Sequence, residues 1–321
     1  MQHTPRHRII VARRVTDAVA ARARTAFDAI LATEDMEVPA VLRLTAEQGT
    51  QGLFAGPRLR FTAADIAALP DSLRVIANPS AGFDHMDVAA AKARGIVVTN
   101  TPDVLTDCTA DLAFLLILAA CRRAAEYLGV MQTGWHKPFG MPDLLGLRPS
   151  GRRLGIVGMG RIGRAVARRA RGFGMPVLYH NRRRLDPAQE EGATFVPGLD
   201  ALLEQSQILS LHLPGGEAGI LMTAERFARL PRGAVFVNTA RGSLVDEDAL
   251  IAALQSGHLF AAGLDVFRRE PDFDRRLAAL PNVFLTPHVA SATQQTRDAM
   301  GLGALDNIAA VLDGRVPPNP I

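Results

Sequence analysis

The chain has 321 residues, of which 48% are apolar and 21% are charged, and its formal net charge is +4. This length and composition are typical of a folded protein of about two domains and exclude a disordered or fibrous chain. Nearly all basic residues are arginines scattered among acids, and the longest uncharged apolar run, 112–121, is about half of a membrane span. We therefore expect neither a nucleic-acid partner nor a membrane segment.

The N-terminal third alternates short apolar runs with amphipathic stretches. The apolar runs predict strands at 9–11, 41–44, 75–77 and 96–99. Helical periodicity predicts helices over 16–31 and 62–69. An alternation of this kind predicts an α/β unit built on a parallel sheet.

A long apolar helix is predicted over 104–128, and a segment rich in glycine and proline follows over 134–151. The helix contains both cysteines of the chain, Cys108 and Cys121, which are expected to be buried thiols. Thiols of this kind are typical of a reducing compartment, so we predict a cytoplasmic protein. The chain has no H-E-x-x-H or C-x-x-C pattern, and no metal site is predicted.

Residues 154–163 read LGIVGMGRIG, an apolar run that opens into G-x-G-x-x-G at Gly158, Gly160 and Gly163. The first glycine permits a sharp turn, the second lets the backbone approach a pyrophosphate, and the third lets a helix pack tightly on a strand. The helix predicted over 161–172 would direct its first N–H groups at the phosphates. The predicted cofactor contacts of this loop are Gly158, Met159, Gly160, Arg161, Ile162 and Gly163.

The end of the next strand, predicted at 177–179, bears on the choice between NAD and NADP. NAD-preferring sites carry an acidic residue there, which accepts hydrogen bonds from the ribose hydroxyls. This chain has Asn181, Arg182, Arg183 and Arg184 instead. Arginine forms forked, charge-assisted hydrogen bonds to phosphate. The pattern predicts NADP, with NAD as the alternative if the arginines are only solvated surface charges.

Further strands are predicted at 208–211, 234–238, 261–264 and 283–285. The last helix, 291–312, follows the completed second sheet and is expected to return to the first unit. We therefore predict two doubly wound parallel-sheet (Rossmann/flavodoxin-like) domains with an interdomain cleft. The predicted substrate domain is 1–102 plus 287–321, and the predicted dinucleotide-binding Rossmann domain is 103–286.

Three side chains suited to catalysis follow predicted strands. Arg241 lies in NTARG, Glu270 in DVFRREP and His288 in TPH. In an open parallel sheet the carboxyl ends of the strands share one edge, where ligands bind, so the three are expected to converge. Each residue alone is more typical of a surface or a loop. Together with the glycine fingerprint they predict an active site.

The motifs in combination resemble those of the D-isomer-specific 2-hydroxyacid dehydrogenases, and most closely the glyoxylate/hydroxypyruvate reductase branch. The matching stretches are SAGFDHMD at 80–87, GIVVTNTPDVLTD at 95–107, Ser291-Ala292-Thr293 and Arg297. The resemblance covers about residues 70–316. In the loop at 213–217 this chain has glycines where the family usually has Thr-Pro.

The resemblance implies roles for individual residues. His288 would be the general acid, and Glu270 would hold its imidazole and favour the charged form. Arg241 would bind the substrate carboxylate, with backbone N–H groups of Ala81 and Gly82 on its other side. Trp135 is expected to reach a substrate pocket across a dimer interface, or else to be only an interface or surface anchor. The remaining implied cofactor contacts are Thr109, Leu213, Pro214, Thr239, Ala240 and Asp265, the last through the nicotinamide carboxamide.

These inferences predict an NADPH-preferring reductase of small 2-oxo acids, glyoxylate and hydroxypyruvate first, that forms D-2-hydroxy acids. A homodimer is expected from the 134–151 segment. One alternative is another dehydrogenase of the family, acting on phosphite or 3-phosphoglycerate. A second is a non-catalytic scaffold that senses NAD(P).

Overall fold

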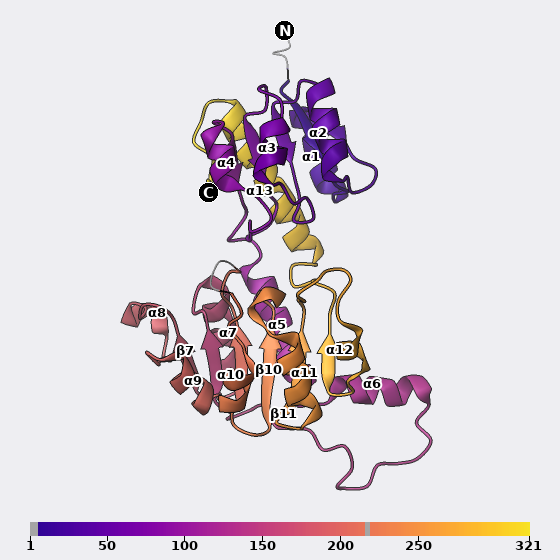
Figure 1. The fold of residues 1–321 in the computed structure, drawn as a ribbon, viewed down its shortest axis with the longest axis vertical. Coiled ribbons are helices and arrows are strands. Elements are labelled where there is room, and N and C mark those ends of the chain that lie inside the picture. Colours follow the sequence, from indigo (N-terminus) through magenta and orange to yellow (C-terminus); the bar gives the residue numbers. More distant parts are fainter. Residues whose placement is uncertain (1–5, 216–218) are drawn as a thin grey trace. The chain divides into compact units, whose positions relative to one another are not determined.

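The computed structural model describes residues 6–215 and 219–321. The chain folds into two compact units (Figure 1). Unit 1 runs up to Leu105 and resumes at Ser291, and unit 2 spans Thr106–Ala290. Each unit is a parallel sheet between layers of helices, which confirms the predicted fold class.

The sheet of unit 1 has five parallel strands in the order β2-β1-β3-β4-β5. The strands are β1 (Arg8–Val11), β2 (Asp28–Leu31), β3 (Gly52–Phe54), β4 (Val75–Ala77) and β5 (Val97–Thr99). The helices are α1 (Asp17–Ala26), α2 (Val38–Glu47), α3 (Ala63–Ala68), α4 (Val88–Ala93) and α13 (Gln294–Leu312). Because side chains alternate along a strand, Ile10 of β1 packs with α2, α3 and α4, whereas Ile9 and Val11 pack with α1 and α13.

Two of the predicted elements in unit 1 are wrong. Residues 41–44 are not a strand but lie in α2, whose first turn contains Pro39, a position where proline favours a helix. The helix predicted over 16–31 ends at Ala26, and residues 28–31 form β2 instead, parallel to β1. β3 was not predicted, since its residues Gly-Leu-Phe include none of the β-branched residues that indicate β4 and β5.

The sheet of unit 2 has seven parallel strands in the order β12-β11-β10-β9-β6-β7-β8. The strands are β6 (Leu154–Val157), β7 (Val177–His180), β8 (Thr194–Phe195), β9 (Ile208–Leu211), β10 (Ala234–Asn238), β11 (Leu259–Leu264) and β12 (Val283–Leu285). The helices are α5 (Thr106–Cys121), α6 (Ala124–Thr133), α7 (Arg161–Gly172), α8 (Pro187–Glu190), α9 (Leu199–Gln205), α10 (Ala224–Arg229), α11 (Glu247–Gln255) and α12 (Arg275–Ala279), with a 3₁₀ turn at Gly242–Leu244. The strand order reverses between β6 and β9, and ligands bind beyond the carboxyl ends of the strands at such a point.

The helix predicted over 104–128 is two helices, α5 and α6. Arg123 adopts the left-handed conformation, with φ of 54°, and this interrupts the helical hydrogen bonds. The apolar α5 packs against α7 and the sheet of unit 2. None of the helices in the described ranges is long and apolar enough to cross a membrane.

Candidate active site

The glycine loop after β6 has the geometry that its three glycines predict. Gly158 has φ of +98°, and a Cβ there would lie 2.6 Å from the carbonyl oxygen of His212. A Cβ on Gly163 would lie 2.3 Å from the carbonyl oxygen of Gly158. Helix α7 can therefore pack this closely on the loop only because residue 163 has no side chain. A Cβ on Gly160 would meet no atom within 4 Å. The loop therefore has open space at the one glycine expected to face a pyrophosphate, and it fits a dinucleotide.

The loop after β7 separates the predicted arginine cluster into two parts. The side-chain oxygen of Asn181 accepts a hydrogen bond of 2.7 Å from the backbone N–H of Met159, which ties this loop to the glycine loop. Arg182 and Arg183 are exposed. Arg184 instead donates to both carboxylate oxygens of Glu190. Its guanidinium is therefore engaged within the protein.

Arg241 follows β10 in a turn that is fixed by its neighbours. The buried side chain of Asn238 accepts from the N–H of Ala240 at 3.0 Å and donates to the carbonyl of Arg241 at 2.9 Å. A Cβ on Gly242 would lie 1.9 Å from the carbonyl carbon of Phe267. This backbone contact brings the Arg241 turn against the 266–270 loop, and the sequence did not single out Gly242 for it.

The predicted acid and its carboxylate are in direct contact. Nδ1 of His288 lies 2.6 Å from Oε2 of Glu270, whose Oε1 accepts a hydrogen bond of 2.9 Å from the N–H of Phe267. Burial raises the pKa of Glu270, but the hydrogen bonds from His288 and Phe267 and the charges of His288 and Arg241 outweigh burial, so this pKa lies below its ordinary value. Because Nδ1 is occupied, Nε2 of His288 is the nitrogen that can exchange a proton with a substrate.

Asp265 fixes the backbone around His288. His288 has φ of +55°, an unusual conformation for a residue with a side chain, and its N–H donates to the carbonyl of Asp265 at 2.8 Å. The fully buried Asp265 carboxylate accepts from Thr286, Val289 and Ala290. Burial raises the pKa of Asp265, and these hydrogen bonds oppose the rise. The predicted contact of Asp265 with a nicotinamide stays a prediction, beside this positioning role.

The other predicted residues are placed in one unit or the other. In unit 2, Thr109 of α5 and Thr239 and Ala240 after β10 are buried, and Leu213 and Pro214 follow β9. In unit 1, Ala81 and Gly82 follow β4, and their carbonyls accept from Asn100 and Asn78 respectively. Trp135 follows α6 and is 60% exposed. The roles predicted for these residues stay predictions.

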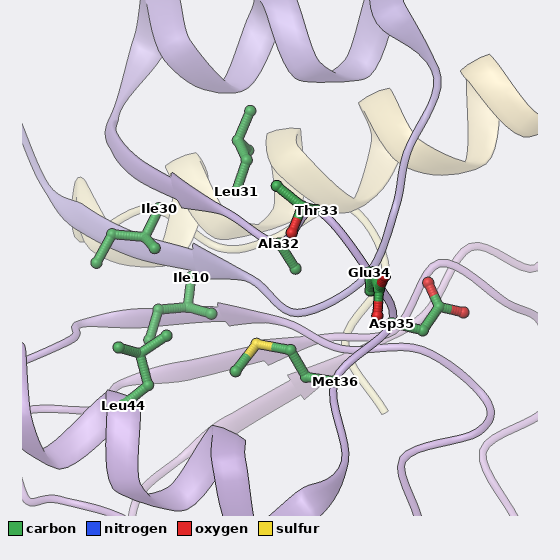
Figure 2. A pocket seen from close by; sticks show the side chains of 9 residues that line it. All are labelled: Ile10, Ile30, Leu31, Ala32, Thr33, Glu34, Asp35, Met36 and Leu44. Carbon is green, nitrogen blue, oxygen red and sulfur yellow. The ribbon is translucent and has the colours of Figure 1, made fainter.

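A cavity of about 350 Å³ lies in unit 1, and its charged groups are negative, in contrast to Arg241 (Figure 2). It is lined by Ile10, Ile30, Leu31, Ala32, Thr33, Glu34, Asp35, Met36 and Leu44. Among the described residues that line it, the charged groups are the carboxylates of Glu34 and Asp35, which would repel an oxo acid. Within residues 6–215 and 219–321, no three His, Cys, Asp or Glu side chains gather as metal ligands.

Comparison with known proteins identifies the family. Residues 114–290 match the family described as D-isomer specific 2-hydroxyacid dehydrogenase, NAD binding domain. A glyoxylate reductase of Korarchaeum cryptofilum is 47% identical over 264 residues, which is 80% of this chain and 78% of the relative.

Two solved structures agree with this match over nearly the whole chain. A Polaromonas sp. JS6 66 protein named as a D-isomer specific 2-hydroxyacid dehydrogenase has a TM-score of 0.93 at 46% identity, covering 99% of this chain and 100% of its own. An NADPH-dependent glyoxylate/hydroxypyruvate reductase from Sinorhizobium meliloti, in complex with NADP and malonate, has a TM-score of 0.86 at 36% identity, covering 98% and 97%. The resemblance seen in the sequence is confirmed, and the chain belongs to the D-isomer specific 2-hydroxyacid dehydrogenase family of oxidoreductases.

Proposed function

We propose that the protein is an NADPH-preferring reductase of small 2-oxo acids, glyoxylate and hydroxypyruvate first, and that it forms the D-2-hydroxy acid. The observation that carries this proposal is the 2.6 Å contact between His288 and Glu270, beside the positive charge of Arg241. The names of the Korarchaeum cryptofilum and Sinorhizobium meliloti relatives support the choice of substrate.

The glycine loop would hold the pyrophosphate of a reduced nicotinamide cofactor, which would supply the hydride for the carbonyl carbon of the oxo acid. Nε2 of His288 donates a proton to the carbonyl oxygen, and solvent later returns that proton. Glu270 holds the ring through Nδ1 and stabilises its positive charge. Arg241 binds the substrate carboxylate with a fork of two N–H donors. Backbone N–H groups of Ala81 and Gly82 are proposed to bind the same carboxylate.

Arg182 and Arg183 are proposed to bind the 2′-phosphate of NADPH. Both guanidiniums are exposed, and the side chain of Asn181 provides no negative charge to repel a phosphate. The charge-assisted bonds that they would form contribute about 1.5–3 kcal/mol each. NAD is the alternative cofactor.

The test is oxidation of NADPH and NADH, followed at the nicotinamide absorbance band, with glyoxylate and hydroxypyruvate. We expect turnover with NADPH to be much faster than with NADH, and Arg182→Ala and Arg183→Ala to raise the KM for NADPH by about tenfold or more. Arg275→Ala, at an exposed arginine of α12, is the matched control. Equal rates with both cofactors would remove the NADPH preference. Cofactor binding without any turnover would favour the non-catalytic scaffold.

A homodimer in the cytoplasm is part of the same proposal. In Figure 1, α6 and the segment after it extend outward from the rest of unit 2. They carry the exposed apolar residues Leu128, Met131, Trp135, Phe139, Met141 and Leu145. Exposed apolar groups in such number are typical of an interface, and we propose that a second copy covers them, with Trp135 near the partner's substrate.

The cytoplasmic location rests on the thiols of Cys108 and Cys121.

The measurement is the mass in solution by light scattering. We expect twice the chain mass for the unaltered protein and a shift toward the monomer for Met131→Lys. Arg43→Lys, at an exposed position of α2, is the control. A monomer at every concentration would contradict the dimer.

A further inference from the structure

Residues 181–186, between β7 and α8, are held at both ends by side-chain bonds. At the first end, Asn181 accepts from the N–H of Met159 at 2.7 Å. At the second end, Nε and Nη2 of Arg184 donate to the two oxygens of Glu190 at 2.8 and 3.0 Å. Between these attachments lie only Arg182 and Arg183, and both are exposed.

Tyr179 joins the strand, the loop and α8 at one point. Its hydroxyl donates to Oε1 of Glu190 at 2.6 Å and accepts from the N–H of Leu185 at 3.1 Å. The Tyr179 side chain is fully buried and packs against the ring of Phe195. Glu190 is only 7% exposed although it carries a charge. A buried carboxylate persists where each oxygen has donors, and both oxygens of Glu190 have them.

We propose that Tyr179, Glu190 and Arg184 form a brace that positions Arg182 and Arg183 for the 2′-phosphate, and so determines the preference for NADPH over NADH. This inference rests on the proposed function. The physical reason is preorganisation: a loop fixed before binding loses less conformational freedom when the phosphate binds. The three brace residues are positioning residues, since none of them needs to touch the cofactor.

The brace persists at physiological pH. Hydrogen bonds from Arg184 and Tyr179 lower the pKa of Glu190 from 4.5 to about 2, so its carboxylate is ionised. The same fork occupies the edge of the Arg184 guanidinium formed by Nε and Nη2, and the charge of Glu190 partly neutralises that of Arg184. Arg184 was predicted as a direct phosphate contact, and this geometry favours an indirect role.

The two roles of Arg184 predict opposite effects of Glu190→Gln. If Arg184 were a phosphate ligand, removing the charge of Glu190 would release the Arg184 guanidinium, and the phosphate would bind more tightly. If it is part of a brace, the same substitution loosens the loop and weakens binding. Tyr179→Phe removes one link and keeps the buried ring. Arg184→Lys keeps the charge and loses the fork, at a side chain that is 59% exposed and so outside the core.

The experiment is titration calorimetry of the full chain with adenosine 2′,5′-bisphosphate and with 5′-AMP, alongside KM and kcat for NADPH and NADH. We expect Glu190→Gln to raise the Kd of the bisphosphate and the KM of NADPH by about tenfold, with kcat and the 5′-AMP affinity changed less than about twofold. Tyr179→Phe and Arg184→Lys should also raise the Kd of the bisphosphate and the KM of NADPH. Glu191→Gln is the matched control, because Glu191 pairs with Arg171 instead.

The outcomes separate the two proposals. Bisphosphate affinity that is unchanged or higher in Glu190→Gln and Tyr179→Phe, in variants whose melting temperature shows that they are folded, overturns the brace and leaves the NADPH preference standing. Equal affinity of the unaltered protein for the two nucleotides overturns the preference itself and the brace with it. If Glu190→Gln does not fold, Tyr179→Phe decides, since it removes one link of the brace, keeps the buried ring and leaves Arg184 unchanged.

Discussion

Glu270→Gln tests the role of the carboxylate that contacts His288, the proposed general acid. The substitution keeps the size of the side chain and replaces a charge-assisted bond to His288 by a neutral one. A charge-assisted bond contributes about 1.5–3 kcal/mol. Since the side chains of His288 and Glu270 are 48% and 34% exposed, solvent screens the pair and the lower end applies. About 1.5–2 kcal/mol corresponds to a fall of about 10- to 30-fold in kcat/KM for the oxo acid.

The assay is steady-state oxidation of NADPH with hydroxypyruvate, at one pH and at saturating cofactor. Glu247→Gln is a matched control, because Glu247 accepts a hydrogen bond of 2.8 Å from the N–H of Arg268 in the same loop. We expect the control to keep kcat/KM within about twofold. His288→Gln should lower the rate by about 10²- to 10⁴-fold, which is the contribution of a positioned general acid.

The double variant decides whether Glu270 acts through His288. If it does, adding Glu270→Gln to His288→Gln lowers kcat/KM hardly any further, because the contact between the two side chains is already lost. A further fall of about 10-fold in the double variant would show an independent role for Glu270 and would refute the reasoning. Unchanged activity in the single variant would refute it as well.

Four other substitutions give further tests. Gly163→Ala should lower the melting temperature by about 2–10 °C, since its Cβ would lie 2.3 Å from a backbone oxygen. Gly160→Ala, whose Cβ would meet no atom within 4 Å, should leave the melting temperature unchanged and weaken NADPH binding, as measured by calorimetry. Arg241→Lys should raise the KM for glyoxylate by about tenfold through loss of the fork, and an unchanged KM would remove Arg241 from the substrate site. Because the pKa of Glu190 falls from 4.5 to about 2 on folding, its charge stabilises the fold above about pH 4.5 and this contribution is lost as the pH falls toward about 2. Urea unfolding across that range should show Glu190→Gln less stable than the unaltered chain at pH 6 and equal to it near pH 2.

The sequence was more informative about unit 2 than about unit 1. β6 and β10 are continuous buried apolar runs followed by motif residues, so their ends and the functional side chains there could be located. In unit 1, β2 and β3 have four and three residues, and their apolar character cannot be distinguished from that of the neighbouring helices. Tertiary packing, not local pattern, decides such short strands.

The site residues that lie in local sequence motifs could also be predicted, whereas those whose role depends on tertiary contacts could not. Arg241, Glu270 and His288 could be named because each follows a strand in a recognisable motif. The engagement of Arg184 by Glu190 could not, because it depends on the turn of α8, although a carboxylate six residues after an arginine was visible. The role of Asp265 in holding His288 depends on a buried loop geometry that no periodicity reports.

The contact of Gly242 with the backbone of Phe267 has a consequence for how this enzyme can diverge. The turn that carries Arg241 and the loop that carries Glu270 meet main chain to main chain, so almost any side chain at residue 242 would force apart the proposed anion-binding and proton-transferring halves of the site. Among the described residues, the loop of Arg182 and Arg183 is attached through the side chains of Asn181, Arg184 and Tyr179, which can be exchanged one at a time. If this loop sets the choice of cofactor, as proposed, mutation can alter that choice gradually, whereas the proposed oxo-acid site can change only as a unit.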